Sequence, residues 1–391
     1  MGFRQRLDTG FYATVQERVR ARLEADGLTA VICDHPDDVA YLTGFFHHPG
    51  ERPVVVHLGL HGRPTLLVPE LEREHAHWQA AAAEVITYPE FPGVVEPLTI
   101  LARAVRARGR VGFGPNMSVG RLRLLERSFA EADLVTSDAV MRTRYVKEPA
   151  ELELHREAAR ITDLMLAAGI TLVTDAVADG GQLPSESELA AHVGRVGMST
   201  MYAEHEDVVV LGFLAGGLVY AGPNSAKPHG LPSSYRLRPG DTFMLSLGCA
   251  VGGRFVEGER TFILGEPSTE QERYYEAVRA AQQVGVDSIR PGLTCAESNA
   301  LCLDVIREAG LGDFLQHRQG HGIGVGMHEP PWLEDGDDTI LEEGFVVSNE
   351  PGIYIPGHAG YRISDSMQIT ADAAVPLTAY PKSLEDVVIG A

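Results

Sequence analysis

The segment "GHGIGVGMHEPP" (residues 320–331) sets two histidines, His321 and His328, among closely spaced glycines. Glycine allows positive φ angles and a close approach of the backbone, so such a segment keeps a site open. The segment "NEPGIYIPGHAGYRISDS" (residues 349–366) follows it and carries Glu350 and Arg362 between prolines and glycines. The order of these two segments is the most specific feature of the chain, and the fold prediction depends on it.

Two earlier segments carry the same residue types. The stretch "LSLGCAVGGRFVEGERTF" (residues 245–262) predicts two apolar strands around a Gly-Gly turn, with Glu257 and Glu259 inside the second strand. Burying a charge is costly unless it is paired, so these two carboxylates indicate a site. The stretch "GPNSAKPHG" (residues 222–230) adds His229. A lone histidine is most often structural, but four segments with histidines and carboxylates together predict one polar pocket.

The pattern along the chain predicts two domains. The first 145 residues alternate strand and helix patterns, with a strand and short helix at 28–45 and a β-hairpin at 52–69, which is typical of a small α/β domain. A long helix with an apolar face begins at Glu148. Apolar strands then predict an antiparallel sheet, covered by two helices that start in capping-box spacing at Ser268 and Thr294. The second domain is therefore expected to be mixed α+β.

The bulk composition excludes several classes of partner. The formal net charge of -21 would repel phosphate backbones, so we expect no nucleic-acid partner. The 4 cysteines form no CxxC pair, and the start of the sequence shows no basic segment followed by an apolar one. No apolar run reaches the roughly 18 to 20 residues that span a bilayer. We expect no membrane partner and a cytoplasmic location.

The order and spacing of these segments resemble the pita-bread superfamily of methionine aminopeptidases, prolidases, Xaa-Pro aminopeptidases and creatinase. The resemblance extends over nearly the whole chain and includes "VAYLTGF" (residues 39–45), "LLVPELE" (66–72) and "VKEPAELELHREAARITD" (146–163). It implies an α+β protein with a creatinase-type N-terminal α/β domain, residues 1–147, followed by a pita-bread catalytic domain, residues 148–391.

The resemblance also implies where metal would bind. Metallopeptidases of this superfamily hold two divalent metal ions with two Asp, one His and two Glu, and these positions fall on Ser246, Glu257, His321, Glu350 and Ser364. A serine hydroxyl is a poor neutral ligand for hard divalent ions. We therefore expect no dinuclear centre and assign no metal ligand, although a single ion at Glu257, His321 and Glu350 stays open.

Creatinase also departs from the metal pattern and works without metal. Its catalytic histidine corresponds to His229, and its paired glutamates correspond to Glu350 and to Glu259, which lies in the same Glu-Arg-Thr triplet. Arg52, in the loop that follows Gly44, matches an arginine that binds the substrate carboxylate in creatinase. In site pattern the chain is thus most similar to creatinase, which implies an enzyme that needs no cofactor.

The chemistry of these residue types is consistent with that implication. Histidine titrates near neutral pH, so His229 would act as the general base toward water. Two facing glutamates would form charge-assisted hydrogen bonds to a nitrogen-rich cation, and His321 would orient an oxygen. The predicted catalytic residues are His229, Glu259, Glu350 and His321, and the predicted substrate-binding residues are Arg52, His328, Glu257 and Trp332.

These observations lead to one main prediction and two alternatives. The main prediction is a metal-independent, creatinase-like hydrolase that cleaves a non-peptide C–N bond of a small cationic or zwitterionic metabolite. The first alternative is a metal-dependent Xaa-Pro dipeptidase or aminopeptidase with a degenerate metal site, and the second is a non-catalytic binding module of the same fold. The resemblance further implies a homodimer with the active site near the subunit interface.

Overall fold

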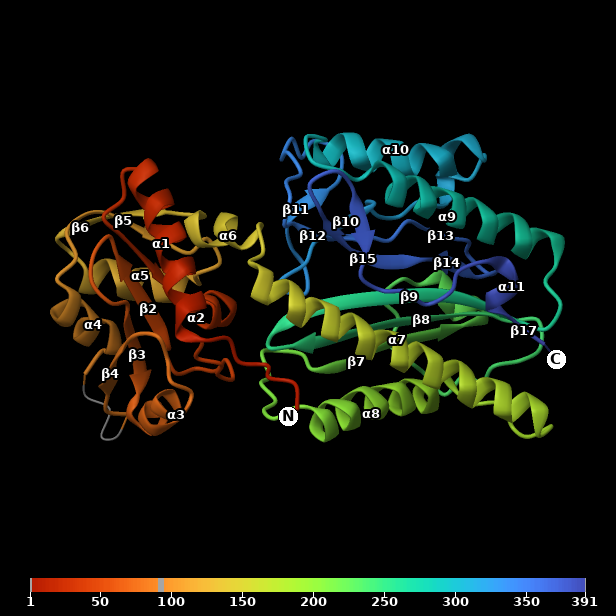
Figure 1. Ribbon diagram of the computed structural model, residues 1–391, viewed down its shortest axis with the longest axis horizontal. Helices are drawn as coiled ribbons and strands as arrows, with labels where there is room; N and C mark the ends of the chain where they lie inside the picture. Colours follow the sequence, from red (N-terminus) through yellow and green to blue (C-terminus); the bar gives the residue numbers. More distant parts are fainter. Residues whose placement is uncertain (1, 91–94, 391) are drawn as a thin grey trace. The chain divides into compact units, whose positions relative to one another are not determined.

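The computed structural model describes residues 2–90 and 95–390, which divide into two compact units (Figure 1). The smaller unit comprises residues 4–90, 95–144 and 209–212. The larger unit comprises residues 145–208 and 213–390, together with residues 2 and 3. The main division between the units falls after residue 144. The predicted domain boundary between residues 147 and 148 stays a prediction.

The smaller unit is built on a 6-stranded sheet of order β4-β3-β2-β1-β5-β6. The β2 strand pairs antiparallel with β1 and β3, and the remaining pairs are parallel. Its strands are β1 (Ala30–Cys33), β2 (Val55–Gly59), β3 (Thr65–Pro69), β4 (Glu84–Tyr88), β5 (Gly109–Phe113) and β6 (Ala132–Thr136). Its α-helices are α1 (Thr9–Ala25), α2 (Pro36–Thr43), α3 (Arg73–Trp78), α4 (Pro97–Val105), α5 (Val119–Ser128) and α6 (Ala139–Arg144), and η1 (Glu70–Glu72) is a 3₁₀ turn.

Two local predictions are confirmed in this unit. The 28–45 segment forms β1 and α2, and α2 ends at Gly44, whose φ of 71° lies in the left-handed region that glycine adopts without strain. The 52–69 segment contains β2 and β3, which pair antiparallel as a hairpin. Side chains of α4 and α5, including Leu101 and Leu125, pack against the sheet in one buried apolar cluster.

The larger unit is built on a 9-stranded sheet whose main path is β11-β10-β12-β15-β9-β8-β7. All of its pairs are antiparallel except the one between β17 and β9. Its strands are β7 (Ala215–Ala221), β8 (Thr242–Val251), β9 (Arg254–Leu264), β10 (Gly320–Gly322), β11 (Glu329–Leu333), β12 (Val346–Asn349), β15 (Ser364–Ile369), β16 (Ala374–Pro376) and β17 (Val388–Ile389). A separate ribbon pairs β13 (Gly352–Tyr354) with β14 (Gly360–Arg362).

Helices cover this sheet (Figure 1). The helices α7 and α8 pack against β7, β8 and β9, whereas α9 and α10 pack against each other and against β11, β12 and β16. The α-helices of this unit are α7 (Pro149–Ala178), α8 (Glu186–Glu204), α9 (Thr269–Ser288), α10 (Cys295–Glu308) and α11 (Leu384–Val387), and the 3₁₀ turns are η2 (Gly222–Ala226) and η3 (Gly312–Phe314). The capping boxes predicted at Ser268 and Thr294 are present at the starts of α9 and α10.

One helix of the described residues, α7, is long and apolar enough to cross a membrane by length and composition. It packs against β8, β9 and α8, and core helices meet the same criterion. The contacts of α7 explain its apolar face without a membrane.

Candidate active site

A cavity of about 870 Å³ opens in the larger unit, lined in part by residues of β7, β8, β9 and β10. It brings together six of the predicted site residues: His229, Glu257, Glu259, His321, His328 and Glu350. They come from the loop after β7 and from β9, β10 and the segments that follow β10 and β12. The four sequence segments therefore converge on one pocket, as predicted, although the roles assigned to their residues remain proposals.

Strand alternation explains why two glutamates face the pocket from one strand. Side chains two residues apart point to the same face, so Glu257 and Glu259 both project from β9 into the cavity. Sheet register places Glu259 between Ser246 on β8 and Ser364 on β15. The two serines that replace expected metal ligands thus flank a carboxylate.

His321 lies between two carboxylates. Its Nε2 atom is 3.3 Å from Glu350 Oε1 and 3.7 Å from Glu257 Oε2. Its Nδ1 lies 3.0 Å from the carbonyl oxygen of Gly322, which can only accept, so Nδ1 carries a proton. A neutral His321 would then direct the Nε2 lone pair at the two carboxylates. The arrangement requires a positive charge at Nε2, either a proton or a bound cation.

The pKa values of His321 and of its neighbours Glu257, Glu350 and His328 follow from this geometry. Burial alone would lower the pKa of His321, but the carboxylates of Glu257 and Glu350 outweigh burial and raise it to about 9. Burial and the charge of Glu350 raise the pKa of Glu257 above its ordinary value. For Glu350, the contact with His321 outweighs burial and lowers the pKa. Burial and the charge of His321 lower the pKa of His328 to about 4.

The neighbouring groups limit what metal the pocket would hold. Ser364 Oγ donates to Glu257 Oε1 at 2.9 Å, and Ser246 Oγ donates to Glu259 Oε1, so both hydroxyls are used within the protein. Hydroxyls of this kind do not replace the charge of two aspartate or glutamate ligands. The residues present do not fit the dinuclear centre that the fold family implies.

A single divalent ion is a better fit to the donors. Ligand atoms of Glu257, His321 and His328 lie within 4.8 Å of one another. The buried Nε2 of His321 has no hydrogen-bond partner among the described residues, and Glu350 lies beside it. Carboxylate oxygens and an imidazole nitrogen are ordinary ligands for transition-metal ions. The observed donors are therefore suited to one ion at Glu257 and His321, beside both Glu350 and His328.

Arg362 fills the side of the pocket near the two serines. Its Nη2 donates to Glu259 Oε1 at 2.9 Å and to Ser246 Oγ at 3.1 Å, and its Nη1 donates to Tyr354 Oη at 3.0 Å. Burial opposes the charge of Arg362, but Glu259 outweighs it and raises the pKa of the guanidinium further. Arg362 thus pairs with Glu259 and not with Asp365, its near neighbour in the sequence.

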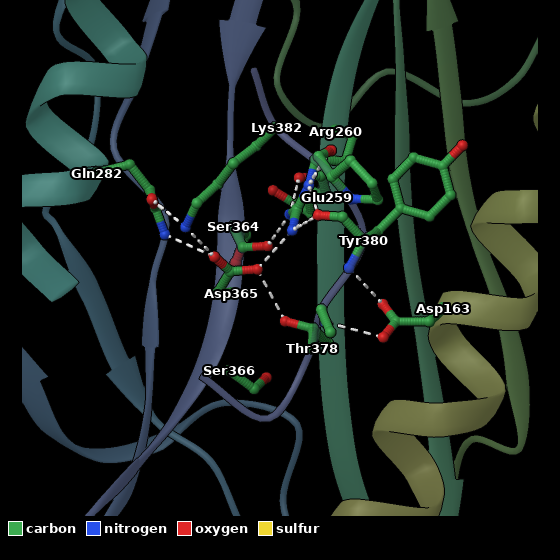
Figure 2. A network of polar contacts seen from close by, with 12 residues as sticks. Asp163, Glu259, Arg260, Gln282, Ser364, Asp365, Ser366, Thr378, Tyr380 and Lys382 are labelled. Atoms are coloured by element: carbon green, nitrogen blue, oxygen red, sulfur yellow. Dashed lines mark hydrogen bonds and ion pairs between the residues drawn. The ribbon is translucent and has the colours of Figure 1, made fainter. Parts of the chain in front are cut away.

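Asp365 instead belongs to a network on the other face of the sheet, which Figure 2 shows. Its carboxylate accepts from Arg260 at 2.7 Å, from Thr378 at 2.9 Å, and from Gln282 and Lys382 at 2.8 Å each. Arg260 also donates to the carbonyl oxygens of Glu259 and Ser364 at 2.8 Å. This network fixes β9 to β15 directly behind the pocket.

Two predicted substrate-binding residues lie outside the cavity. Arg52 belongs to the smaller unit, where it is exposed and pairs with Glu51 and Glu90, so its predicted role stays a prediction. Trp332 is not among the described lining residues, because its ring lies under the guanidinium of Arg318, 4.2 Å away. Its effect on a ligand would be indirect, through Arg318.

The cavity contains lining residues that the sequence analysis missed. Arg318 and Glu334 form an ion pair of 2.7 Å at its edge, and Phe213, Leu218 and Met327 are apolar lining residues. Arg318 lies in an irregular segment before β10, so strand alternation does not predict where its side chain points. Its place in the pocket depends on η3 and the irregular segment 315–319 that follows it.

The sequence matches the models of two known domain families. Residues 153–371 match the model of metallopeptidase family M24, and residues 16–146 match that of the creatinase/prolidase N-terminal domain. The chain is 29% identical to the Xaa-Pro dipeptidase of Lactobacillus delbrueckii subsp. lactis, over 94% of this chain and 98% of the relative. It is 31% identical to the Xaa-Pro dipeptidase of Pyrococcus furiosus, over 82% of this chain and 86% of the relative.

A solved structure extends the likeness to three dimensions. The dipeptidase PepE from Mycobacterium ulcerans has a TM-score of 0.84 and 29% sequence identity to this protein, and the alignment covers 99% of this chain and 100% of that one. The predicted pita-bread fold with a creatinase-type N-terminal domain is confirmed.

The comparisons correct the main functional prediction. The relatives carry the names of dipeptidases, and the matched family is one of metallopeptidases, so the prediction of a metal-independent, creatinase-like hydrolase is wrong. The coarser prediction of a hydrolase is supported. The serines at 246 and 364, on which that prediction depended, are thus differences within a family of metallopeptidases.

Proposed function

Because the chain belongs to metallopeptidase family M24, we propose that it is a metal-dependent dipeptidase of the Xaa-Pro type with a degenerate metal site. In this proposal one divalent cation binds to Glu257, His321 and Glu350. The substrate is a dipeptide with proline as its second residue, the class named for two relatives.

The convergence of two carboxylates on His321 Nε2 supports the proposal most directly. Glu350 and Glu257 lie 3.3 and 3.7 Å from that atom, and the Nδ1 proton faces a carbonyl oxygen. A cation at this point would satisfy all three groups at once. It would also remove the repulsion between two buried carboxylates, which otherwise costs free energy.

The side chains around the cation have distinct proposed roles. A divalent cation would supply Lewis acidity toward the scissile carbonyl group. His229, exposed at the edge of the cavity, would transfer a proton to the leaving nitrogen, a contribution typically worth about 10² to 10⁴ in rate. His328 stays neutral because its pKa is lowered to about 4, so it would donate or accept a hydrogen bond to the dipeptide.

The cavity suits a small substrate. Its volume of about 870 Å³ lies within the range of pockets that enclose small ligands. Phe213, Leu218 and Phe255 provide apolar wall, on which a proline ring would pack. Arg318 at the edge would pair with the carboxylate of the dipeptide in exchange for Glu334, its present partner.

Assembly and location belong to the same proposal. We propose a homodimer in which Arg52 of one subunit reaches the active site of the other. The cysteines Cys33, Cys249, Cys295 and Cys302 are all free and buried, which agrees with a reducing cytoplasm.

The decisive experiment compares metal-stripped and reconstituted protein. After chelation and dialysis, hydrolysis of a panel of Xaa-Pro dipeptides is measured by product chromatography with no metal, and with Mn²⁺, Co²⁺ or Zn²⁺. We expect activity only after metal is added, and none in His321→Ala, which retains Glu257 and Glu350. Absence of hydrolysis with every metal and every Xaa-Pro dipeptide would refute the proposed function.

A further inference from the structure

His229 lies in the long connection between β7, which ends at Ala221, and β8, which begins at Thr242. Apart from η2 (Gly222–Ala226), this connection has no helix or strand. His229 itself is exposed, and a proton carrier must lie within hydrogen-bond reach of its substrate. The position of His229 therefore depends on the side-chain and backbone contacts that fix this connection to the rest of the unit.

The carboxylate of Glu186 holds both ends of the segment that contains His229, residues 221–233. One oxygen, Oε1, accepts from the backbone N–H of Ala221 at 2.8 Å and from Asn224 Nδ2 at 3.1 Å. The other oxygen, Oε2, accepts from the backbone N–H of Ser233 at 2.8 Å and from its hydroxyl at 2.5 Å. A single side chain thus links the two ends of the loop, with two donors on each oxygen.

The carboxylate of Glu186 is buried and surrounded by hydrogen-bond donors. The residue is only 1% exposed, and no cation pairs with it among the described contacts. It is the first residue of α8, where the helix dipole favours a negative charge. Its backbone N–H donates to the carbonyl oxygen of Tyr235 at 2.9 Å, which fixes the loop to the helix a second time. Charge-assisted bonds of this kind are stronger than neutral ones.

We propose that Glu186 is the positioning residue for His229. It touches neither the cavity nor a ligand, and it acts by setting the separation of the two loop ends. Two further bonds, from Tyr220 Oη to the carbonyl of Pro228 at 2.7 Å and from the Gly360 N–H to Ser225 Oγ at 2.9 Å, fix the middle of the loop against the pocket wall. The loop is consequently held at its ends by one carboxylate and at its middle by bonds to β7 and β14.

The test compares two glutamate substitutions on the same helix. Glu186→Gln keeps the shape, but its amide NH₂ would face donors that need an acceptor. Glu188→Gln is the matched control, because Glu188 is exposed, caps the same helix through Ser185 and pairs with Arg236, and does not contact residues 221–233. Ser233→Ala, which removes one donor and keeps the carboxylate, is a milder second variant.

Hydrogen exchange gives a readout that needs no activity. We expect faster exchange of backbone amides within 221–233 in Glu186→Gln, a smaller increase in Ser233→Ala, and no change there in Glu188→Gln. Unchanged exchange in Glu186→Gln would overturn the assignment of Glu186 as the residue that holds the loop.

A double-mutant cycle gives the second readout, and this part rests on the role proposed for His229. Misplacing a reacting group by about 1 Å can cost on the order of 10²-fold, so Glu186→Gln should lower kcat/KM by about 10- to 100-fold in the wild-type background. In the His229→Ala background we expect little further loss. An equal loss in both backgrounds would overturn the inference, because Glu186 would then act independently of His229. If His229→Ala alone leaves activity unchanged, the role of His229 in the proposed function is refuted. The hydrogen-exchange result still decides separately whether Glu186 holds residues 221–233.

Discussion

Arg362 and Glu259 form a buried ion pair inside the cavity, with Nη2 of the arginine 2.9 Å from Oε1 of the glutamate. The relative exposures of the two side chains are 5% and 6%, so water screens the pair little. Ser246 donates to the same carboxylate oxygen. One side of the pocket thus contains a carboxylate whose charge is already balanced within the protein.

This pairing predicts the metal content. Glu259 is occupied by Arg362, and Ser246 and Ser364 supply no charge, so Glu257, His321 and Glu350, with His328 beside them, are the described donors that remain for a cation. We expect one divalent ion per chain when the reconstituted protein is measured by elemental analysis and by calorimetric titration. Two ions per chain would show that the serines or Glu259 ligate after all, and none would contradict the metal dependence of the proposed function.

Adding carboxylates at residues 246 and 364 tests the predicted metal content. The double variant Ser246→Asp with Ser364→Glu restores a carboxylate at each position where the resemblance places one. We expect its stoichiometry to rise from one ion to two, since hard divalent ions prefer carboxylate oxygens. The double variant Ser246→Asn with Ser364→Gln is the matched control, because it has nearly the same size and adds no charge, so its stoichiometry should stay at one ion.

Ser364 should tune the affinity for that ion. Its hydroxyl donates to Glu257 Oε1 at 2.9 Å and so orients a proposed ligand. Loss of such an outer partner typically weakens metal binding by about 10- to 100-fold. We expect this decrease in Ser364→Ala by calorimetric titration, with the unfolding transition nearly unchanged. An unaltered dissociation constant would mean that Glu257 is not a ligand.

Local sequence patterns predicted much of the fold and the composition of the pocket. The strand-helix unit at 28–45, the hairpin at 52–69 and the capping boxes of α9 and α10 depend on neighbouring residues, which a linear sequence displays. Strand alternation explains the common face of Glu257 and Glu259, although the sequence analysis predicted only that both carboxylates indicate a site.

The partners of the polar side chains could not be predicted in this way. The segment "GGQLPSESE" (residues 180–188) has no local pattern that indicates burial, yet Glu186 is buried because its donors lie at 221–233, far along the chain. Arg362 lies three residues from Asp365 in the sequence, whereas its partner Glu259 is on another strand. Such pairings depend on sheet register, which no local pattern specifies.

Arg52 offers a test of the proposed dimer. It is exposed in the smaller unit and pairs with Glu51 and Glu90, so a substrate carboxylate would have to replace these partners. If Arg52 reaches the active site of a second subunit, Arg52→Ala should raise KM by roughly tenfold with little change in kcat. Arg110→Ala, another exposed arginine of the same unit, should leave both constants unchanged. A protein that is fully active as a monomer in light scattering would exclude this role.

The network behind the pocket predicts how stability depends on Asp365. This carboxylate is 1% exposed and pairs with Arg260, which is equally buried, and with Lys382 (Figure 2). Removing one partner of a buried pair leaves an uncompensated charge and typically costs about 3 to 5 kcal/mol. Asp365→Asn should therefore melt well below the wild type at pH 7, by roughly 10 °C, in calorimetry. Asp372→Asn, in an exposed segment after β15, should have the same melting temperature as the wild type.

The pH dependence of this difference follows from the pKa of Asp365. Burial raises the pKa, but the charges of Arg260 and Lys382 outweigh burial and hold it below the ordinary value of 3.8. A carboxylate whose pKa is lower in the folded state stabilises that state above its unfolded pKa, and this stabilisation disappears as pH falls through the folded value. The difference in unfolding free energy between wild type and Asp365→Asn should thus be full at pH 5 to 7 and shrink below about pH 4, as measured by urea titration. A difference that persists unchanged at the lowest pH would mean that Asp365 acts through hydrogen bonds to Thr378 and Gln282, which need no charge, and not through its charge.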